Sequence, residues 1–195
     1  MDLTIFSYSE AQTESIGQAL GLAVQPGDVL ALVGDLGAGK TCLTRGIARG
    51  LGIDEAVTSP TFILVAEYVT QGGFLLYHAD CYRLGNAAAE AHDIGLDEIM
   101  GDDGVCVIEW ADRIQRLLPP DYLHIILTAT DNTERRLDFH PTGPRAAELL
   151  LGLQAHPPRR IVNFQLTIVN DPECSDDRPL AIDNSQFTIH NFPCS

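Results

Sequence analysis

The chain contains a single lysine, Lys40, and it lies in residues 34–41, which read Gly-Asp-Leu-Gly-Ala-Gly-Lys-Thr. This octapeptide matches the phosphate-binding loop pattern G-x-x-x-x-G-K-S/T at every fixed position. The remaining 11 of the 12 basic side chains are arginines, so lysine is used only where a compact, flexible ammonium suits phosphate better than a planar guanidinium. Guanine-specific P-loop GTPases normally read their base with an Asn-Lys-x-Asp element, which would need a second lysine. The sequence therefore favours adenine as the base.

The residues on either side of the loop supply the strand and the helix that this motif requires. Residues 29–33 form a short, continuous apolar run, which is typical of a strand buried on both faces. Residues 41–51 predict a helix that ends at Gly52. A strand, a glycine-rich loop and a helix in this order indicate a nucleoside-triphosphate site, not a chance glycine-rich turn.

The rest of the first 153 residues alternates between strand-like and helix-like segments. Further strands are expected at residues 62–69, 74–77, 104–109, 122–129 and 135–139. Further helices are expected at residues 9–20, with a capping box at Ser9, at 87–100, with an interruption at Gly95, and at 111–117 and 143–153. Strands mixed with crossover helices predict an α/β fold: a P-loop NTPase-like three-layer sandwich with a largely parallel central sheet and helices on both faces.

The character of the sequence changes at about residue 154. We therefore expect a P-loop ATPase domain over residues 1–153 and a C-terminal extension over residues 154–195. The extension contains a weak internal echo between residues 163–170 and 184–191, and both segments alternate as strands do. A two-strand hairpin, a coincidence within a poorly ordered tail and a functional arm are three interpretations that the sequence leaves open.

The formal net charge of −15 argues against direct, strong binding of nucleic acid. The adjacent arginine pairs, Arg135-Arg136 and Arg159-Arg160, are too small to form a basic patch. Protein partners with basic faces, or a small anion held by backbone amides, fit this surface better.

Nothing in the hydropathy or cysteine content indicates a membrane or an oxidising compartment. No apolar run reaches about 18 residues, and residues 1–6 lack the basic region and long apolar stretch of a signal peptide. The five cysteines are widely spaced and form no CxxC pair: Cys42, Cys81, Cys106, Cys174 and Cys194. Neither a disulfide framework nor a zinc site is expected from them, and we expect a cytoplasmic protein without membrane contact.

The loop residues have separate expected roles in binding ATP or ADP. The glycines permit a tight path, and the backbone amides at the helix N-terminus would surround a phosphate group. Lys40 would neutralise the β- and γ-phosphates, Thr41 would offer its hydroxyl to Mg²⁺, and the thiol of Cys42 has no evident part. The residues expected to bind the nucleotide in this segment are Leu36, Gly37, Ala38, Gly39, Lys40, Thr41 and Cys42.

Two acidic residues end strand-like runs and are candidates for the magnesium site. Asp80 ends the run of residues 74–80, and Glu109 ends the run of residues 105–109. Parallel strands present ligands at their carboxyl ends, and a P-loop enzyme needs a carboxylate there to hold Mg²⁺. Either residue alone could be a solvated acid at a strand end, but their joint presence favours the metal role.

Four further features each allow a functional and a structural interpretation. Trp110, the only tryptophan, could stack on the base or pack as a core or rim aromatic residue. His78 could orient a neighbour, although its spacing favours core packing. Arg83 could face phosphate or pair with surface acids. Residues 59–61, Ser-Pro-Thr, either lie in a switch segment or form a simple turn.

Four motifs occur in an order that resembles the TsaE family, the small bacterial ATPases of tRNA threonylcarbamoyladenosine synthesis. They are the loop at residues 34–41, Thr-Ser-Pro-Thr-Phe at 58–62, His-Ala-Asp-Cys-Tyr-Arg-Leu at 78–84 and Glu-Trp at 109–110. The first and third motifs together are highly specific, and the resemblance covers about residues 1–153.

The resemblance implies a role for each matching residue. Lys40 and the loop amides would hold the phosphates, and Mg²⁺ would be bound by Thr41 and Glu109 with Asp80 nearby. Trp110 would stack on adenine, and Thr61 would lie in a switch-like loop that senses the γ-phosphate. The implied catalytic residues are Lys40, Thr61, Asp80 and Glu109. The region that supports catalysis and partner contact would also include His78, Tyr82 and Arg83, without individual roles.

Members of this family are weak ATPases alone and act with two partner proteins, TsaB and TsaD, that modify adenosine 37 of tRNA. The resemblance implies these partners here, with tRNA contacted only through the complex and ATP hydrolysis used to drive turnover. Two alternatives are a small-molecule P-loop kinase and a non-hydrolytic, nucleotide-dependent interaction module. Residues 87–103 contain neither lysine nor arginine, which argues against the phosphate-clamping lid of a kinase.

Overall fold

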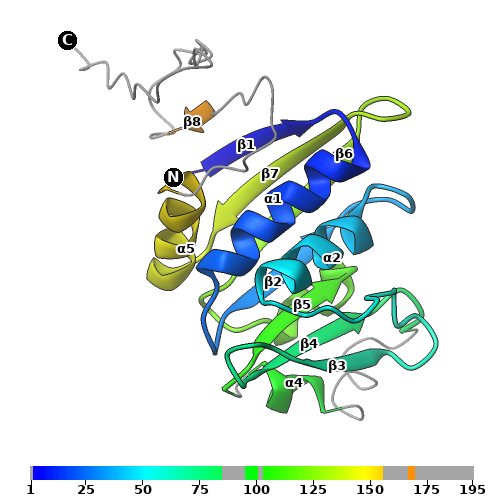
Figure 1. The fold of residues 1–195 in the computed structure, drawn as a ribbon, viewed down its shortest axis with the longest axis vertical. Coiled ribbons are helices and arrows are strands. Elements are labelled where there is room, and N and C mark those ends of the chain that lie inside the picture. Colours follow the sequence, from blue (N-terminus) through cyan, green and yellow to red (C-terminus); the bar gives the residue numbers. More distant parts are fainter. Residues whose placement is uncertain (1, 85–94, 101–102, 156–166, 170–195) are drawn as a thin grey trace.

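The computed structural model describes residues 2–84, 95–100, 103–155 and 167–169. The described strands form one sheet in the order β3-β4-β5-β2-β6-β7-β1-β8 (Figure 1). Their bounds are β1 (Asp2–Ser7), β2 (Val29–Val33), β3 (Val65–Val69), β4 (Leu75–Asp80), β5 (Val105–Glu109), β6 (Leu123–Ala129), β7 (Arg135–Pro141) and β8 (Thr167–Val169).

Parallel pairing is confined to the centre of the sheet. Strands β4, β5, β2 and β6 run parallel to one another, whereas β3, β7, β1 and β8 each pair antiparallel with a neighbour. Short turns join β3 to β4 and β6 to β7, and a short turn can connect only antiparallel strands. The carboxyl ends of β2, β4 and β5 therefore lie at the same end of the sheet.

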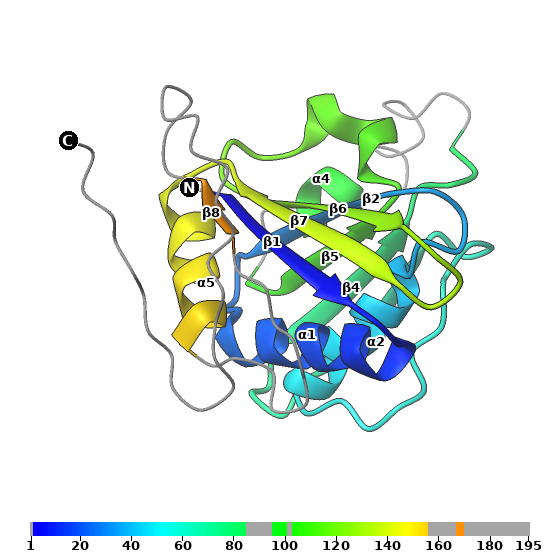
Figure 2. The same cartoon turned by 90° about the horizontal axis from the view of Figure 1, so that it is seen from above.

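Helices cover both faces of the sheet, which confirms the predicted α/β sandwich. One face carries α1 (Glu10–Ala23), α2 (Lys40–Gly50) and α5 (Pro144–Ala155) (Figure 2). Their apolar side chains share a core with Leu30 and Leu32 of β2. The other face carries α4 (Leu96–Ile99) and the 3-10 helix η1 (Ala111–Leu117), which share a core with Val29 and Ala31. Because β2 is buried on both faces, its apolar run shows no alternation with polar residues.

Helices α1 and α2 lie side by side because glycines let their backbones approach closely. A Cβ atom added at Gly17 would lie 2.2 Å from the carbonyl oxygen of Leu43, and one added at Gly46 would lie 2.2 Å from that of Glu14. Gly21 and Gly50 make equivalent approaches one turn further along. Since α2 begins at Lys40, this contact also fixes the helix that carries the phosphate loop.

We expect Gly17→Ala to lower the free energy of unfolding by about 1–3 kcal/mol, because the added methyl group forces two helix backbones apart. Leu22→Ala is the matched control, since Leu22 lies on the same helix with 66% of its surface exposed and should change stability by less than about 0.5 kcal/mol. Urea denaturation of both variants measures the difference. Equal stability of the two variants would contradict the close-packing argument.

The structure corrects two expectations for individual segments. Strand β1 was not predicted, although its burial alternates along residues 2–7, with Leu3 and Ile5 inside. The strand predicted for residues 62–69 begins only at Val65, because the amides of Ile63 and Leu64 both donate to the carbonyl oxygen of Pro60 and form a turn.

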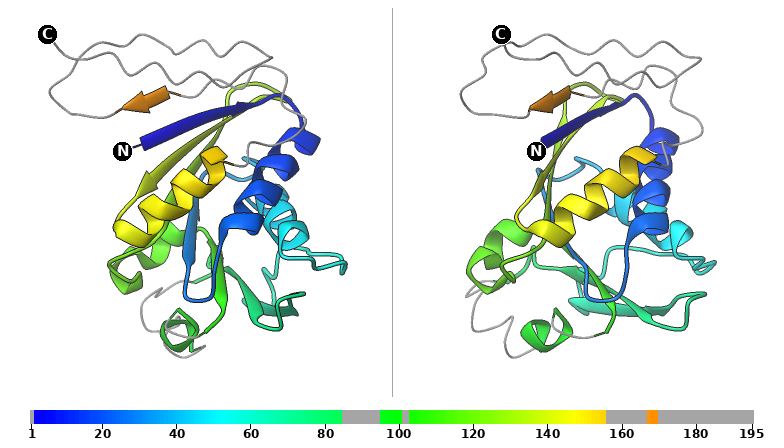
Figure 3. Two further views of the ribbon diagram at one scale, coloured as in Figure 1. Left: turned by 60° about the vertical axis from the view of Figure 1, so that its left-hand side comes forward. Right: turned by 90° about the vertical axis from the view of Figure 1, so that its left-hand side faces the viewer.

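Part of the predicted helix at residues 87–100 lies outside the described residues, and α4 forms its last turn. In the extension, β8 lies within the first echo segment, residues 163–170, and pairs antiparallel with β1, with Thr167 opposite Thr4 (Figure 3). The second echo segment, residues 184–191, lies outside the described residues. Within the described ranges, no helix is long and apolar enough to cross a membrane.

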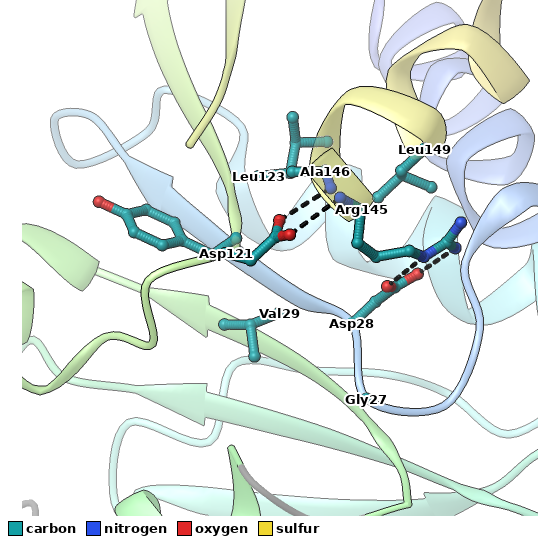
Figure 4. Close-up of a pocket in the computed structure, with 9 residues that line it drawn as sticks. Gly27, Asp28, Val29, Asp121, Leu123, Arg145, Ala146 and Leu149 are labelled. Carbon is teal, nitrogen blue, oxygen red and sulfur yellow. Dashed lines mark hydrogen bonds and ion pairs between the residues drawn. The ribbon is translucent and has the colours of Figure 1, made fainter. Parts of the chain in front are cut away.

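The end of the sheet opposite the phosphate loop carries a small cavity of about 120 Å³ beside α5 (Figure 4). Asp28 accepts two hydrogen bonds from the guanidinium of Arg145, from Nε at 2.8 Å and from Nη2 at 2.7 Å. These bonds to Asp28 raise the pKa of Arg145. Asp121 accepts from the backbone amides of Arg145 and Ala146, which are free at the start of α5. This group therefore fastens α5 to the sheet.

Candidate nucleotide-binding site

The phosphate loop connects the carboxyl end of β2 to the start of α2 at the centre of the sheet. Gly34, Gly37 and Gly39 all have positive φ angles, of 150°, 79° and 105°. At Gly34 the requirement is also spatial, because a Cβ atom there would lie 2.3 Å from the carbonyl oxygen of Leu127 on β6. The glycines of the motif are therefore needed for the path of the loop between β2 and its neighbour.

Lys40 turns its side chain back over this loop. Its Nζ atom donates to the carbonyl oxygens of Gly34 at 2.6 Å and Asp35 at 3.0 Å, and it lies 3.8 Å from the centroid of the Trp110 ring. The residue is 4% exposed. Burial lowers the pKa of Lys40, while the carboxylates of Glu109 and Asp80 act in the opposite direction. The ammonium group of the single lysine therefore lies against the backbone of the phosphate loop.

Glu109, the last residue of β5, joins the loop to the sheet. Its Oε2 atom accepts a hydrogen bond from Thr41 Oγ1 at 3.0 Å, and its Oε1 atom lies 2.8 Å from His78 Nε2. The resemblance implied that Thr41 and Glu109 would lie together, and the structure brings their side chains into contact. A hydroxyl and a carboxylate are the hard oxygen donors that Mg²⁺ prefers.

Asp80, the last residue of β4, lies opposite Glu109 in the parallel pairing but has different partners. Its Oδ2 atom accepts from Thr61 Oγ1 at 2.7 Å and also from the hydroxyl of Ser59, and its Oδ1 atom accepts from the amide of Tyr82 at 3.0 Å. Asp80 therefore binds the Ser-Pro-Thr segment to the sheet, so this predicted switch segment lies directly beside the candidate metal site.

The donor set fits a cation that is shared with a nucleotide. Among the described residues, no group of three or more histidine, cysteine or acidic side chains gathers into a metal centre. Mg²⁺ in nucleotide sites is commonly bound by one or two protein oxygens, with phosphate and water completing the shell. Thr41 and Glu109 would supply two such oxygens.

Trp110 lies at the entrance of the site in a strained conformation, with a φ angle of +58°. Besides covering Lys40, its half-buried ring packs 4.9 Å from the Tyr82 ring, centroid to centroid, and 5.9 Å from the guanidinium of Arg113. Of the interpretations that the sequence offered, rim packing describes this arrangement. Stacking of Trp110 on adenine stays a prediction.

Two of the other sequence candidates have their side-chain contacts outside the phosphate loop. The thiol of Cys42 is buried and donates to the carbonyl oxygen of Glu10 on α1, and burial raises its pKa. Contact of Cys42 with a nucleotide stays a prediction and would have to use its backbone. Arg83 places its guanidinium 4.2 Å from the centroid of the Phe62 ring.

Sequence reasoning missed two contacts of the site. Arg135 of β7 donates to the carbonyl oxygen of Gly37 at 3.3 Å, across 98 residues of sequence, and only the strand order brings it there. For His78 the sequence favoured core packing over a role in orienting a neighbour; the residue is fully buried, and it also contacts Glu109. Its position two residues before Asp80 on one strand was the available signal, because such residues share a face.

The chain matches a family model described as "Threonylcarbamoyl adenosine biosynthesis protein TsaE" over residues 7–137. A Bacillus subtilis relative named tRNA threonylcarbamoyladenosine biosynthesis protein TsaE is 43% identical over 145 residues, which cover 74% of this chain and 89% of the relative. A relative of the same name from Treponema pallidum is 42% identical over 131 residues, covering 67% of this chain and 95% of the relative.

The fold has a counterpart among solved structures. The crystal structure of YdiB from Bacillus subtilis superimposes with a TM-score of 0.69 at 37% sequence identity, covering 80% of this chain and 96% of that chain. The family match includes the phosphate loop, both strand-end carboxylates and Trp110. These comparisons confirm the resemblance found in the four motifs: the chain belongs to the TsaE family of threonylcarbamoyl adenosine biosynthesis proteins.

Proposed function

We propose that this chain is a Mg²⁺-dependent ATPase that acts with TsaB and TsaD in the threonylcarbamoylation of tRNA adenosine 37. The observation that carries the ATPase assignment is the 3.0 Å contact between Thr41 Oγ1 and Glu109 Oε2. It joins the end of a phosphate loop to a strand-end carboxylate, which is the arrangement that P-loop enzymes use to hold Mg²⁺. Family membership supports the assignment to tRNA threonylcarbamoyladenosine synthesis.

Each residue of the site then has a task. Lys40 would exchange its loop carbonyls for phosphate oxygens, alongside the amides of residues 36–41. Thr41 and Glu109 would hold Mg²⁺, which neutralises charge on the phosphate groups when bound. Asp80 would position the switch segment near the metal, and Thr61 would have to exchange Asp80 for the γ-phosphate in order to sense it.

Exposed apolar side chains beside the site support a protein partner. Phe62 and Ile63, directly after Thr61, are 83% and 70% exposed, and Leu36 of the phosphate loop is 82% exposed. Large apolar residues gathered around a functional site favour a docking surface. With a net charge of −15, we propose that tRNA is contacted through TsaB and TsaD and not by this chain directly.

A nucleotide-dependent interaction module without hydrolysis is the second candidate. It is favoured by the position of Phe62 and Ile63, which directly follow the segment that Asp80 binds, so that movement of this segment would reposition a docking surface. The two candidates differ in whether hydrolysis is needed. A Glu109→Ala variant that still supports modification of tRNA in cells would favour the module.

The proposed function is tested by measuring ATP hydrolysis by the purified protein, first alone and then with TsaB, TsaD and tRNA. We expect slow turnover alone and faster turnover with the partners. Fast turnover alone, or none with the partners present, would contradict the proposal and direct the search to acceptor molecules for a kinase.

We expect Ile63→Ser to reduce stimulation by the partners about tenfold, because a hydroxyl in place of an apolar anchor removes roughly 1–2 kcal/mol of buried contact. Val69→Ser is the matched control. Val69 is also an exposed apolar residue, at 66%, but it lies at the end of β3 that is remote from the site. Titration of ATPase rate against TsaB–TsaD concentration compares them, and equal stimulation of both variants would exclude this surface.

A further inference from the structure

His78 is a buried polar residue at a position where an apolar side chain would suffice for packing. Along β4, Leu76, His78 and Asp80 point to the face of the sheet that carries α2, because alternate residues of a strand share a face. Leu76 packs into the apolar core of that face, and Val107 lies opposite His78 on β5. His78 is 0% exposed, so its polar atoms need partners inside the protein.

The contacts of His78 identify its hydrogen-bond partner and show which of the two residues donates. Nε2 lies 2.8 Å from Glu109 Oε1, whereas the buried Nδ1 atom has no hydrogen-bond partner among the residues that the structure describes. A hydrogen on Nδ1 would be a buried donor without an acceptor, so the network assigns the ring hydrogen to Nε2. His78 therefore donates to Glu109.

Glu109 is consequently held from two sides. Its Oε1 atom accepts from His78 behind it, and its Oε2 atom accepts from Thr41 at the start of α2. The Glu109 side chain is only 3% exposed, so solvent water does not compete with His78 and Thr41 for its oxygen atoms. The imidazole thus fixes the plane of the carboxylate so that one oxygen faces the phosphate loop.

We propose that His78 is a positioning residue that orients Glu109 for Mg²⁺, through the hydrogen bond from Nε2 to Oε1. This inference rests on the proposed Mg²⁺–nucleotide site and assigns its supporting contact. Residues that orient a metal-binding carboxylate typically change metal affinity or activity about 10–100-fold when they are removed. A role in packing alone would change stability and leave the response to Mg²⁺ intact.

The test compares His78→Leu, which removes the donor but fills a similar volume, with His78→Gln, whose amide can place an N–H group near the position of Nε2. His78→Met replaces the leucine variant if that variant does not fold. Val107→Ala is the matched control, since it removes methyl groups from the same core beside His78 and removes no hydrogen-bonding group of the site. Calorimetry measures the affinity for ADP in EDTA and across a Mg²⁺ titration.

The unaltered protein should bind ADP more tightly with Mg²⁺ than in EDTA. In His78→Leu we expect half-saturation at about tenfold or more higher Mg²⁺, with unchanged affinity in EDTA. His78→Gln should recover most of the Mg²⁺ response, and Val107→Ala should melt at lower temperature with a normal response.

Two results would overturn the inference and leave the proposed function standing: a normal Mg²⁺ response in His78→Leu, or a response in His78→Gln as poor as that of the leucine variant. Absence of any Mg²⁺ effect on ADP binding by the unaltered protein would instead overturn the proposed metal site, and the role of His78 with it.

Discussion

Lys40→Met should lower the rate of ATP hydrolysis by about 10²–10³-fold or more, because the removed ammonium makes charge-assisted contacts that strengthen as charge develops on the phosphate groups. Methionine keeps the unbranched stem and removes only the charge. Lys40→Arg should also be strongly impaired, since a planar guanidinium cannot follow the turn that brings Nζ to the carbonyl oxygens of Gly34 and Asp35. Steady-state hydrolysis with Mg²⁺ and saturating ATP measures both variants.

The Lys40→Met variant should fold normally. A lowered pKa for Lys40 means that the folded protein holds the ammonium less favourably than water does. Removing that charge at neutral pH therefore sacrifices little electrostatic stability. Arg116→Ala, which removes an exposed positive charge at the end of η1, should change neither turnover nor melting temperature. Normal turnover in Lys40→Met would refute the assignment of the phosphate site.

Glu109→Gln is expected to lower ATP turnover about 10²-fold or more and to raise the Mg²⁺ requirement. Glutamine keeps the shape of the side chain, but its amide can accept from His78 Nε2 only by directing its NH₂ group toward Thr41. An NH₂ group then occupies the position of the oxygen that accepts from Thr41 in the unaltered protein. This group is a hydrogen-bond donor and cannot bind a cation. Hydrolysis rates measured across a Mg²⁺ titration separate the loss of affinity from the loss of rate.

Asp112→Asn provides the control for charge alone. Asp112 is exposed on η1 and acts on Lys40 electrostatically at a distance. Neutralising it removes one negative charge near the site and no contact with Thr41. We expect less than a twofold change in turnover, because exposed charges are screened by solvent and salt. If Asp112→Asn lowered turnover as much as Glu109→Gln does, the loss would come from the change in net charge near the site and not from the hydrogen-bond geometry of Glu109.

The sequence predicted the parts of the site that depend on local pattern. The strand, loop and helix around Lys40 follow one another directly, so their arrangement needs no knowledge of distant contacts. That a carboxylate would lie near Thr41 could also be anticipated, because parallel strands present their last residues at one end of the sheet. Strand direction left Asp80 and Glu109 as equal candidates, and the resemblance to the family singled out Glu109.

The features that the sequence did not predict depend on register, strand order and backbone strain. The bond between His78 and Glu109 requires that both side chains point to the same face of neighbouring strands. Arg135 reaches the loop only because β6 and β7 follow β2 in the sheet. Residues 62–64 are as apolar as a strand, but Leu64 adopts a φ angle of +68°, which ends the extended conformation.

The position of Trp110 has a practical consequence for spectroscopy. It is the only indole in the protein, and it lies 3.8 Å from the ammonium of Lys40. Light at wavelengths that tyrosine does not absorb therefore excites one chromophore, located where phosphate would arrive. If the proposed function holds, intrinsic emission should follow nucleotide arrival, partner docking and product release in real time, without a label and without a background from other tryptophans.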